Sequence, residues 1–152
     1  MENLDIDKYK ISSIGKRASA YFIDDIIVSL FLFIIFYDQL VNIYLSLQQN
    51  PMDFTPMATF LEQNTIVFLL LRVVYQTFFV WQSGMTPGKR LLKIKVIELD
   101  SGDIPSFQVA FLRATLRIIS DSIFYLGYIF AYFNPLVQTL HDKLAKTIVV
   151  DV

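Results

Sequence analysis

The chain has 152 residues, enough for one domain, and 55% of them are hydrophobic, above the roughly 45–50% of ordinary soluble domains. Its formal net charge of -1 gives no general attraction to nucleic acid, and the absence of cysteine excludes disulfides and thiolate metal sites. Its single histidine, His141, excludes a metal site built from several histidines of one chain. This composition favours an integral membrane protein that binds no nucleic acid.

The first apolar run starts at Ala18 and covers about 20 residues, the length that a helix needs to cross a bilayer. We expect a helix over residues 16–37, which can continue as a longer helix until Pro51 stops it. No small-residue cleavage pattern follows the run, which argues against a signal peptide. We expect the polar residues 1–15 to form a short cytoplasmic segment and residues 16–152 to form the transmembrane domain.

The next part of the chain predicts a loop and a second spanning helix. Residues 48–64 contain two prolines and no basic residue, and we expect a loop there. The apolar residues 66–82 predict the helix, with Trp81 as an anchor at the membrane interface. The sequence GMTPGKR at 84–90 then breaks the helix and begins a basic patch.

Two later segments predict β-strands. Residues 93–100 (KIKVIELD) alternate basic and apolar side chains and precede a Ser-Gly-Asp turn signal, and residues 146–152 (KTIVVDV) are similar in character. Two isolated strands at the same membrane face can pair and so satisfy backbone groups that neither strand satisfies alone. We therefore expect a small cytoplasmic two-stranded β element.

The distribution of basic residues predicts that both termini lie in the cytoplasm. Residues 38–65 carry only acidic charges, whereas the other segments that flank apolar runs are basic. Residues 107–140 must then cross the membrane twice or not at all, although about 34 residues are few for two spans of roughly 20. We expect short or tilted helices over 107–120 and 123–139; the alternative is that the first lies in the interface. The predicted fold is all-α, with about four transmembrane helices in a bacterial cytoplasmic (inner) membrane.

Two adjacent aspartates, Asp24 and Asp25, lie within the first apolar run, where an unpaired charge costs about 2.5 kcal/mol or more. Arg17 lies seven residues before Asp24, on the same helix face. Other charged residues in apolar segments are Arg72, Arg113, Arg117 and Asp121. The last three follow an i, i+4, i+8 spacing, which places them in one stripe. An arginine fork binds a carboxylate through two hydrogen bonds, so Arg17, Arg113 and Arg117 are the leading partners for the aspartates.

Several other signals are weak. The sequence GMTPGK at 84–89 is similar to a phosphate loop, but it is one residue short and has Arg90 in place of the Ser/Thr. The pair His141-Asp142 has no second histidine to complete a metal site, and it favours a local turn. No nucleophile elbow surrounds any serine. We therefore expect neither an enzyme nor a bound cofactor.

Four blocks of the sequence, in order over about residues 15–152, resemble the RDD family of membrane proteins. The Arg-Asp-Asp signature of that family resembles Arg17 with Asp24 and Asp25, and its TPGK segment is similar to TPGKRLLKIKVIELDSGDIPS at 86–106. Its arginine-bearing third block and its HD-x-L-A-x-T ending are similar to later blocks. The matching positions beyond the signature are Thr86, Pro87, Gly88, Lys89, Arg113, Arg117, His141 and Asp142.

The resemblance implies transport, because the family is generally proposed to move small ions or other ligands, and sodium–proton antiport is an activity associated with it. One hypothesis is a secondary transporter that exchanges protons for Na⁺, Li⁺ or K⁺ at Asp24 and Asp25, while an arginine pairs with the vacated carboxylate. A chain this short predicts that transport needs a homo-oligomer in the lipid bilayer. The other hypothesis is an accessory or scaffold subunit of a membrane complex, whose ion pairs fix helix register and whose strands dock cytoplasmic partners.

Overall fold

The computed structural model describes residues 9–122 and 130–152, without the side chains at 121, 122 and 130. Helix α1 (Ile14–Ile35) begins after Ser13, whose hydroxyl accepts a hydrogen bond from the Lys16 N–H at 3.4 Å. The chain bends at Phe36 and continues as helix α2 (Tyr37–Gln49). The predicted helix over 16–37 is therefore confirmed, and its continuation toward Pro51 forms a separate helix.

Helix α3 (Thr55–Ser83) contains the predicted second spanning helix but starts well before it. The loop predicted over residues 48–64 is confirmed only for residues 50–54, because α2 runs to Gln49 and α3 begins at Thr55, with Pro56 in its first turn. A proline costs little there, since the N–H that it lacks has no partner within the first turn. Gly84 ends the helix in the left-handed conformation, with φ 70°.

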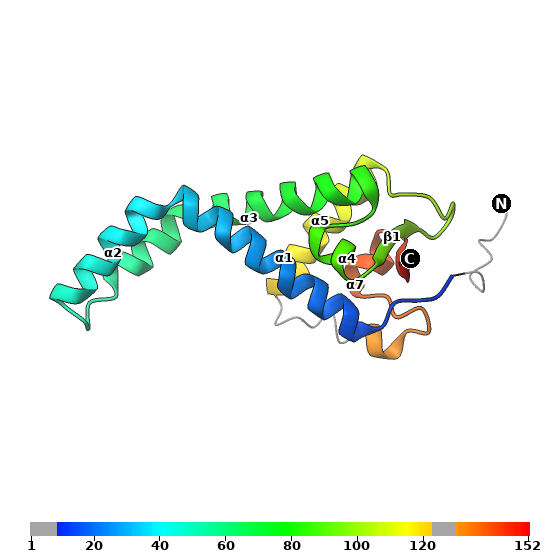
Figure 1. Cartoon of the computed structure of the whole chain (residues 1–152), viewed down its shortest axis with the longest axis horizontal. Coiled ribbons are helices and arrows are strands. Elements are labelled where there is room, and N and C mark those ends of the chain that lie inside the picture. The colour runs from blue at the N-terminus through cyan, green and yellow to red at the C-terminus, as the bar shows by residue number, and fades with distance from the viewer. Residues whose placement is uncertain (1–8, 123–129) are drawn as a thin grey trace.

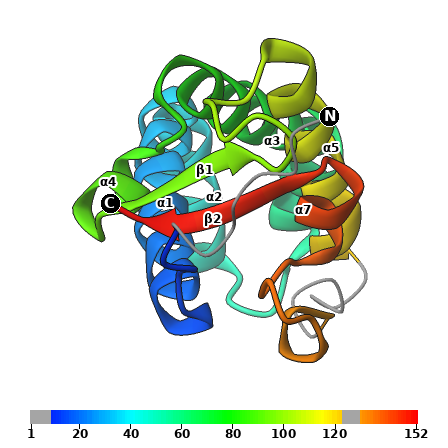
Figure 2. The ribbon, with the colours of Figure 1, turned by 90° about the vertical axis from the view of Figure 1, so that its right-hand side faces the viewer.

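A short helix α4 (Pro87–Leu91) leads into a two-stranded antiparallel sheet. Strand β1 (Ile94–Glu98) pairs with strand β2 (Thr147–Asp151), which confirms the predicted β element. The N-terminal segment joins β2 from the other side, because Ile11 bridges Val150 and the Ser12 N–H donates to the Val149 carbonyl at 3.0 Å. Figure 2 shows the strands lying side by side across the ends of the helices. The segment after residue 9 and the C-terminal strand therefore meet at the same end of the molecule.

Helix α5 (Phe107–Ser122) confirms the helix predicted over 107–120. It packs along α3 and precedes a 3₁₀ turn, η2 (Phe130–Phe133), and helix α7 (Leu140–Leu144). The helix predicted over 123–139 falls partly on residues outside the described ranges. Its described part consists of η2 and irregular chain.

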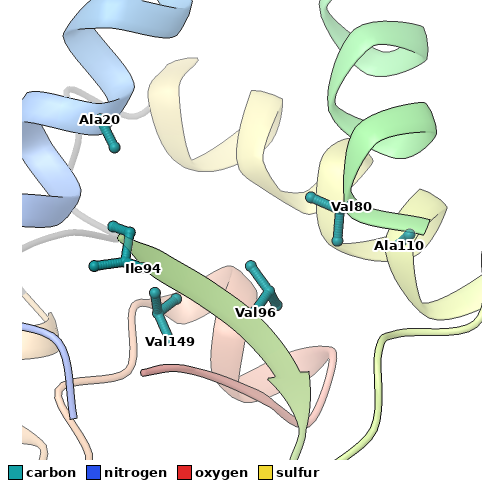
Figure 3. Close-up of a cluster of buried hydrophobic side chains, with 6 residues drawn as sticks. All are labelled: Ala20, Val80, Ile94, Val96, Ala110 and Val149. Carbon is teal, nitrogen blue, oxygen red and sulfur yellow. The ribbon is translucent and has the colours of Figure 1, made fainter. Parts of the chain in front are cut away.

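The main apolar core lies where the sheet meets the helices. Its buried members come from both strands and from α1, α3 and α5, and they face one another in Figure 3: Ala20, Val80, Ile94, Val96, Ala110 and Val149. A second cluster, Phe36, Ile43 and Phe60, joins α2 to α3 at the opposite end of the molecule from the sheet (Figure 1). The long middle parts of α1 and α3 thus lie between two packed ends.

Helices α1 and α3 are long and apolar enough to cross a membrane, and they are the two such helices within the described ranges. Large apolar side chains point outward along both of them, including Ile34 at 71% exposed and Ile66 at 70% exposed. A core helix of a soluble protein hides such side chains, because exposing them to water is unfavourable. The exposed apolar surface of α1 and α3 therefore fits lipid.

Candidate functional site

Three charged residues of α1 have different surroundings. Arg17 and Asp24 are buried, with 9% and 2% of their surface exposed. Asp25 projects about 100° further round the helix, and its side chain is 38% exposed. One helix therefore presents carboxylates to two separate environments.

The Asp24 carboxylate is held by three uncharged donors. Its Oδ1 accepts hydrogen bonds from the Tyr75 hydroxyl at 2.9 Å and from the Gly88 N–H at 2.8 Å. Its Oδ2 accepts one from the Thr86 hydroxyl at 2.5 Å. Hydrogen bonds to a charged group contribute about 1.5–3 kcal/mol each. These donors replace the water that burial removes from the carboxylate.

The TPGK segment has the local structure that this arrangement needs. Thr86 is the N-cap of α4, and its hydroxyl accepts the N–H of the residue three positions on while it donates to Asp24. A Cβ at Gly88 would overlap the carbonyl oxygen of Ala20 and lie 2.9 Å from the Asp24 Oδ1. Only glycine therefore lets α4 approach α1 closely enough for its backbone N–H to reach the carboxylate.

Asp25 faces α3 instead, where its Oδ1 pairs with the Arg72 guanidinium. The two side chains are 38% and 36% exposed, and the Tyr21 hydroxyl lies 3.5 Å from Arg72. Both charged groups line a cavity of about 30 Å³, whose wall also includes Gln76. That volume has room for a water molecule or a small ion. The Asp25 carboxylate is therefore the more accessible of the two aspartates.

Asp142 is the most heavily bonded carboxylate of the site. Its Oδ1 accepts from the Arg113 Nε at 2.9 Å, and its Oδ2 accepts from the Arg17 Nη1 at 3.1 Å and the Thr139 hydroxyl at 2.7 Å. Burial raises the pKa of Asp142, but the charges of Arg113 and Arg17 and the hydrogen bond from Thr139 outweigh burial and hold this pKa well below its usual range. Asp142 therefore joins α7 to α1 and α5.

The remaining basic groups are packed beside this carboxylate. Burial, followed by repulsion from Arg113 and Arg117, lowers the pKa of Lys89 to about 7. Burial also lowers the pKa of His141 well below its usual value, so that this imidazole is neutral near pH 7. The Arg117 guanidinium lies 4.3 Å from the centre of the Tyr21 ring, a cation–π contact. The described residues hold no group of three or more His, Cys, Asp or Glu that could bind a metal ion.

Comparison with known proteins shows the family of the chain. The model of the RDD family matches residues 11–146. The chain belongs to the RDD family. This RDD chain is also 30% identical over 143 residues to the "Uncharacterized protein YxaI" of Bacillus subtilis (strain 168), which covers 88% of this chain and 93% of that protein. No solved structure matches it. With α1 and α3 as candidate spanning helices, the chain is a membrane protein in contact with lipid.

The RDD signature residues do not pair with one another. Arg17, Arg113 and Arg117 were the leading candidates to pair with the two adjacent aspartates, and that prediction was wrong for Arg17 and Arg113, because both bind Asp142. Arg72 is the arginine that pairs with one of the aspartates, Asp25. A helix face predicted from spacing does not reveal which element packs against it. The side chain of Asp121, expected in the same charged stripe, lies outside the described residues.

Sequence reasoning missed three residues of this site. Tyr75 lies three residues after Arg72, so the two share a face of α3, and that spacing could have identified it. Thr139 forms a capping box with Asp142, and the pattern T-x-x-D was visible in the sequence. Tyr21 belongs to an aromatic-rich apolar run, and nothing in the sequence distinguished it from residues that face lipid.

Proposed function

We propose that this RDD protein exchanges protons for a monovalent cation, Na⁺, Li⁺ or K⁺, across the membrane. The observation that carries this proposal is the Asp25–Arg72 pair, which lies on a small cavity and is more than one third exposed on both sides. A carboxylate within a spanning segment is expensive to keep and typically serves an ion or proton pathway. Hard monovalent cations prefer oxygen ligands such as a carboxylate.

In this mechanism Asp25 binds either a proton or the cation. A cation that approaches the carboxylate displaces Arg72, which moves toward the Tyr21 hydroxyl, 3.5 Å away in this structure. When the cation leaves, a proton or Arg72 takes its place on the carboxylate, and the cycle turns in either direction. Asp24 takes no part, because three donors occupy it and it is 2% exposed. Its role is to fix α4 against α1.

We further propose four membrane helices with both termini in the cytoplasm. The hydrogen bonds between the N-terminal segment and β2 support an even number of crossings, since the two ends of the described chain meet at one sheet. The basic residues in three of the four flanking segments support the cytoplasmic side. In this topology α5 and the stretch after it form the last two, short or tilted crossings of a bacterial cytoplasmic membrane.

The transporter is proposed to be a homo-oligomer. Its two long helices expose large apolar side chains along most of their length, as at Leu30 (58% exposed) and Val74 (60% exposed). Helices of a second copy could cover part of this surface and close the open side of the cavity beside Asp25. A complete pathway would then lie between subunits.

A second candidate function is that of an accessory or scaffold subunit. It is favoured by Asp24 and Asp142, whose carboxylate oxygens already accept hydrogen bonds from the protein. Such carboxylates stabilise the fold and leave no place for an exchanged ion. In that role the sheet of β1 and β2 would dock a cytoplasmic partner. The two candidates differ in whether the carboxylate of Asp25 binds and releases a proton and a cation.

The test is cation-driven proton movement in everted vesicles from a host that lacks its own antiporters. Addition of Na⁺, Li⁺ or K⁺ should dissipate the proton gradient in vesicles with the wild-type protein. Asp25→Asn should abolish this activity at matched expression, and Asp38→Asn, which changes an exposed aspartate outside α1, should retain it. A folded wild type without activity, or a fully active Asp25→Asn, would contradict the proposal and favour the scaffold.

A further inference from the structure

A cluster of basic side chains lies beside the Asp24 site and has no part in the proposed exchange. Arg17 of α1, Lys89 of α4 and two arginines of α5, Arg113 and Arg117, line a second small cavity. All four are buried, with between 5% and 9% of their surface exposed. Four bases from three helices have therefore been removed from water and brought to one place.

The two buried carboxylates beside these bases already have donors. Asp142 lines the cavity, and its two oxygens are already occupied by Arg17, Arg113 and Thr139. Asp24 is the other buried carboxylate close to Lys89, and it is occupied by Tyr75, Thr86 and Gly88. Among the described side chains that line this cavity, four are basic and one, Asp142, is acidic.

The positive charges of the cluster act on Lys89. Burial and the positive charges of Arg113 and Arg117 lower its pKa to about 7. Its ammonium donates one long hydrogen bond, to the Thr86 hydroxyl at 3.4 Å. A buried ammonium has three donors, and leaving them without acceptors or a counter-charge costs several kcal/mol. A bound anion would supply both.

We propose that this cavity binds one small oxyanion of the phosphate class, with Lys89, Arg113 and Arg117 as its donors. Arginine forks and a lysine ammonium are the groups that bind phosphate oxygens in proteins. The cavity, about 30 Å³, has room for one small group and not for a large ligand. It lies near the start of α1, beside the sheet, so the phosphate can be free in solution or belong to an anionic lipid headgroup.

The experiment measures the thermal unfolding midpoint of the purified full-length chain. Inorganic phosphate is compared with sodium chloride at equal ionic strength in a zwitterionic detergent. In parallel, nanodiscs of phosphatidylcholine are compared with nanodiscs that also contain phosphatidylglycerol. Binding at about 100 times Kd should raise the midpoint by about 5–10 °C. A rise with phosphate assigns the site to a free anion, and a rise with phosphatidylglycerol alone assigns it to a lipid; no specific rise in either arm overturns the proposal.

Two variants separate binding from folding. Lys89→Met should raise the Kd for the anion about tenfold. It should not lower the unfolding midpoint measured without anion, because it removes a buried charge that its neighbours repel. Arg90→Gln is the matched control, since Arg90 is the exposed neighbour on the same short helix and should respond as the wild type does. A Lys89→Met protein that keeps the full response, or that is destabilised without anion, contradicts the proposal. None of these results depends on cation exchange at Asp25.

Discussion

Asp24 and Asp25 are neighbours in the sequence, yet α1 directs them to two unlike regions. On the α4 side, Asp24 is 2% exposed and receives three hydrogen bonds from uncharged donors. On the cavity side, Asp25 is 38% exposed at its side chain and pairs with Arg72. The α4 side, which we call the closed side, binds Asp24 through donors from α3 and α4. The cavity side, which we call the open side, binds Asp25 through one long, flexible side chain.

The proposed exchange needs this difference, because it assigns a structural and an exchangeable carboxylate to the same helix. Uncharged donors fixed by backbone, such as the Gly88 N–H, cannot leave Asp24 without moving α4. An arginine can leave its carboxylate by rotating its own side chain, at a cost set by what replaces it. A partly exposed ion pair is also screened by solvent and contributes little to stability. Stability should therefore depend on the Asp24 side and activity on the Asp25 side.

The largest effect should come from Gly88→Ala, which breaks the closed side. The added methyl group overlaps the carbonyl oxygen of Ala20 and crowds Asp24, so α4 must move away from α1. We expect the free energy of unfolding in mixed micelles to fall by about 3 kcal/mol or more. Gly15→Ala is the control, because nothing lies within 4 Å of its added methyl group. Equal stability of the two variants would show that the close approach of α4 is unimportant.

A smaller effect should appear in the pH dependence of stability, through Lys89. Its pKa is about 7 in the folded protein and about 10.4 in an unfolded chain. Above pH 7 the unfolded state holds more protons, so the stability contributed by this group increases with pH. We expect a gain of about 2 kcal/mol between about pH 7 and pH 9, absent in Lys89→Met. The measurement is the difference between the two unfolding curves, in a buffer without phosphate, and parallel curves would contradict the expectation.

The smallest effect should come from Tyr75→Phe, which removes one of the three donors to Asp24. The loss should be about 1.5 kcal/mol, because the other two donors remain. Tyr44→Phe is the matched control, since its hydroxyl accepts a bond from Gln48 at the exposed surface. Cation exchange should persist in Tyr75→Phe if Asp25 is the working carboxylate. Loss of exchange together with unchanged stability would reverse the roles assigned to the two sides.

Much of the fold follows from local sequence signals. The apolar run from Ala18 forms a helix, and residues 93–100 and 146–152 each contain a strand, as we expected. Gly84 ends a helix where the sequence predicted a break. The loop predicted over 48–64 failed because two prolines were read as breaks, although Pro56 lies in a first turn that tolerates it. Local signals predict that an element exists more reliably than they predict the residue at which it begins.

The pairing within the site could not be predicted in the same way. The charges Arg17, Asp25 and Arg72 were all identified from the sequence, but the choice of partner depends on how helices far apart in the chain pack. Arg17 and Asp142 are separated by 125 residues, and no spacing rule connects them. The neutral donors to Asp24 were harder still, because a threonine, a tyrosine and a backbone N–H carry no charge that marks them as partners.

The separation between Arg17 and Asp142 also has a consequence for the order of synthesis. The ribosome makes α1 first, and the carboxylate that binds Arg17 follows 125 residues later. The strand that carries Asp151, the partner of Lys16, is made later still. The charged start of α1 can therefore complete these bonds only after α7 and β2 have been made. A chain that stops before β2 would lack Asp151, the partner of Lys16, and the Val149 carbonyl that accepts from Arg17.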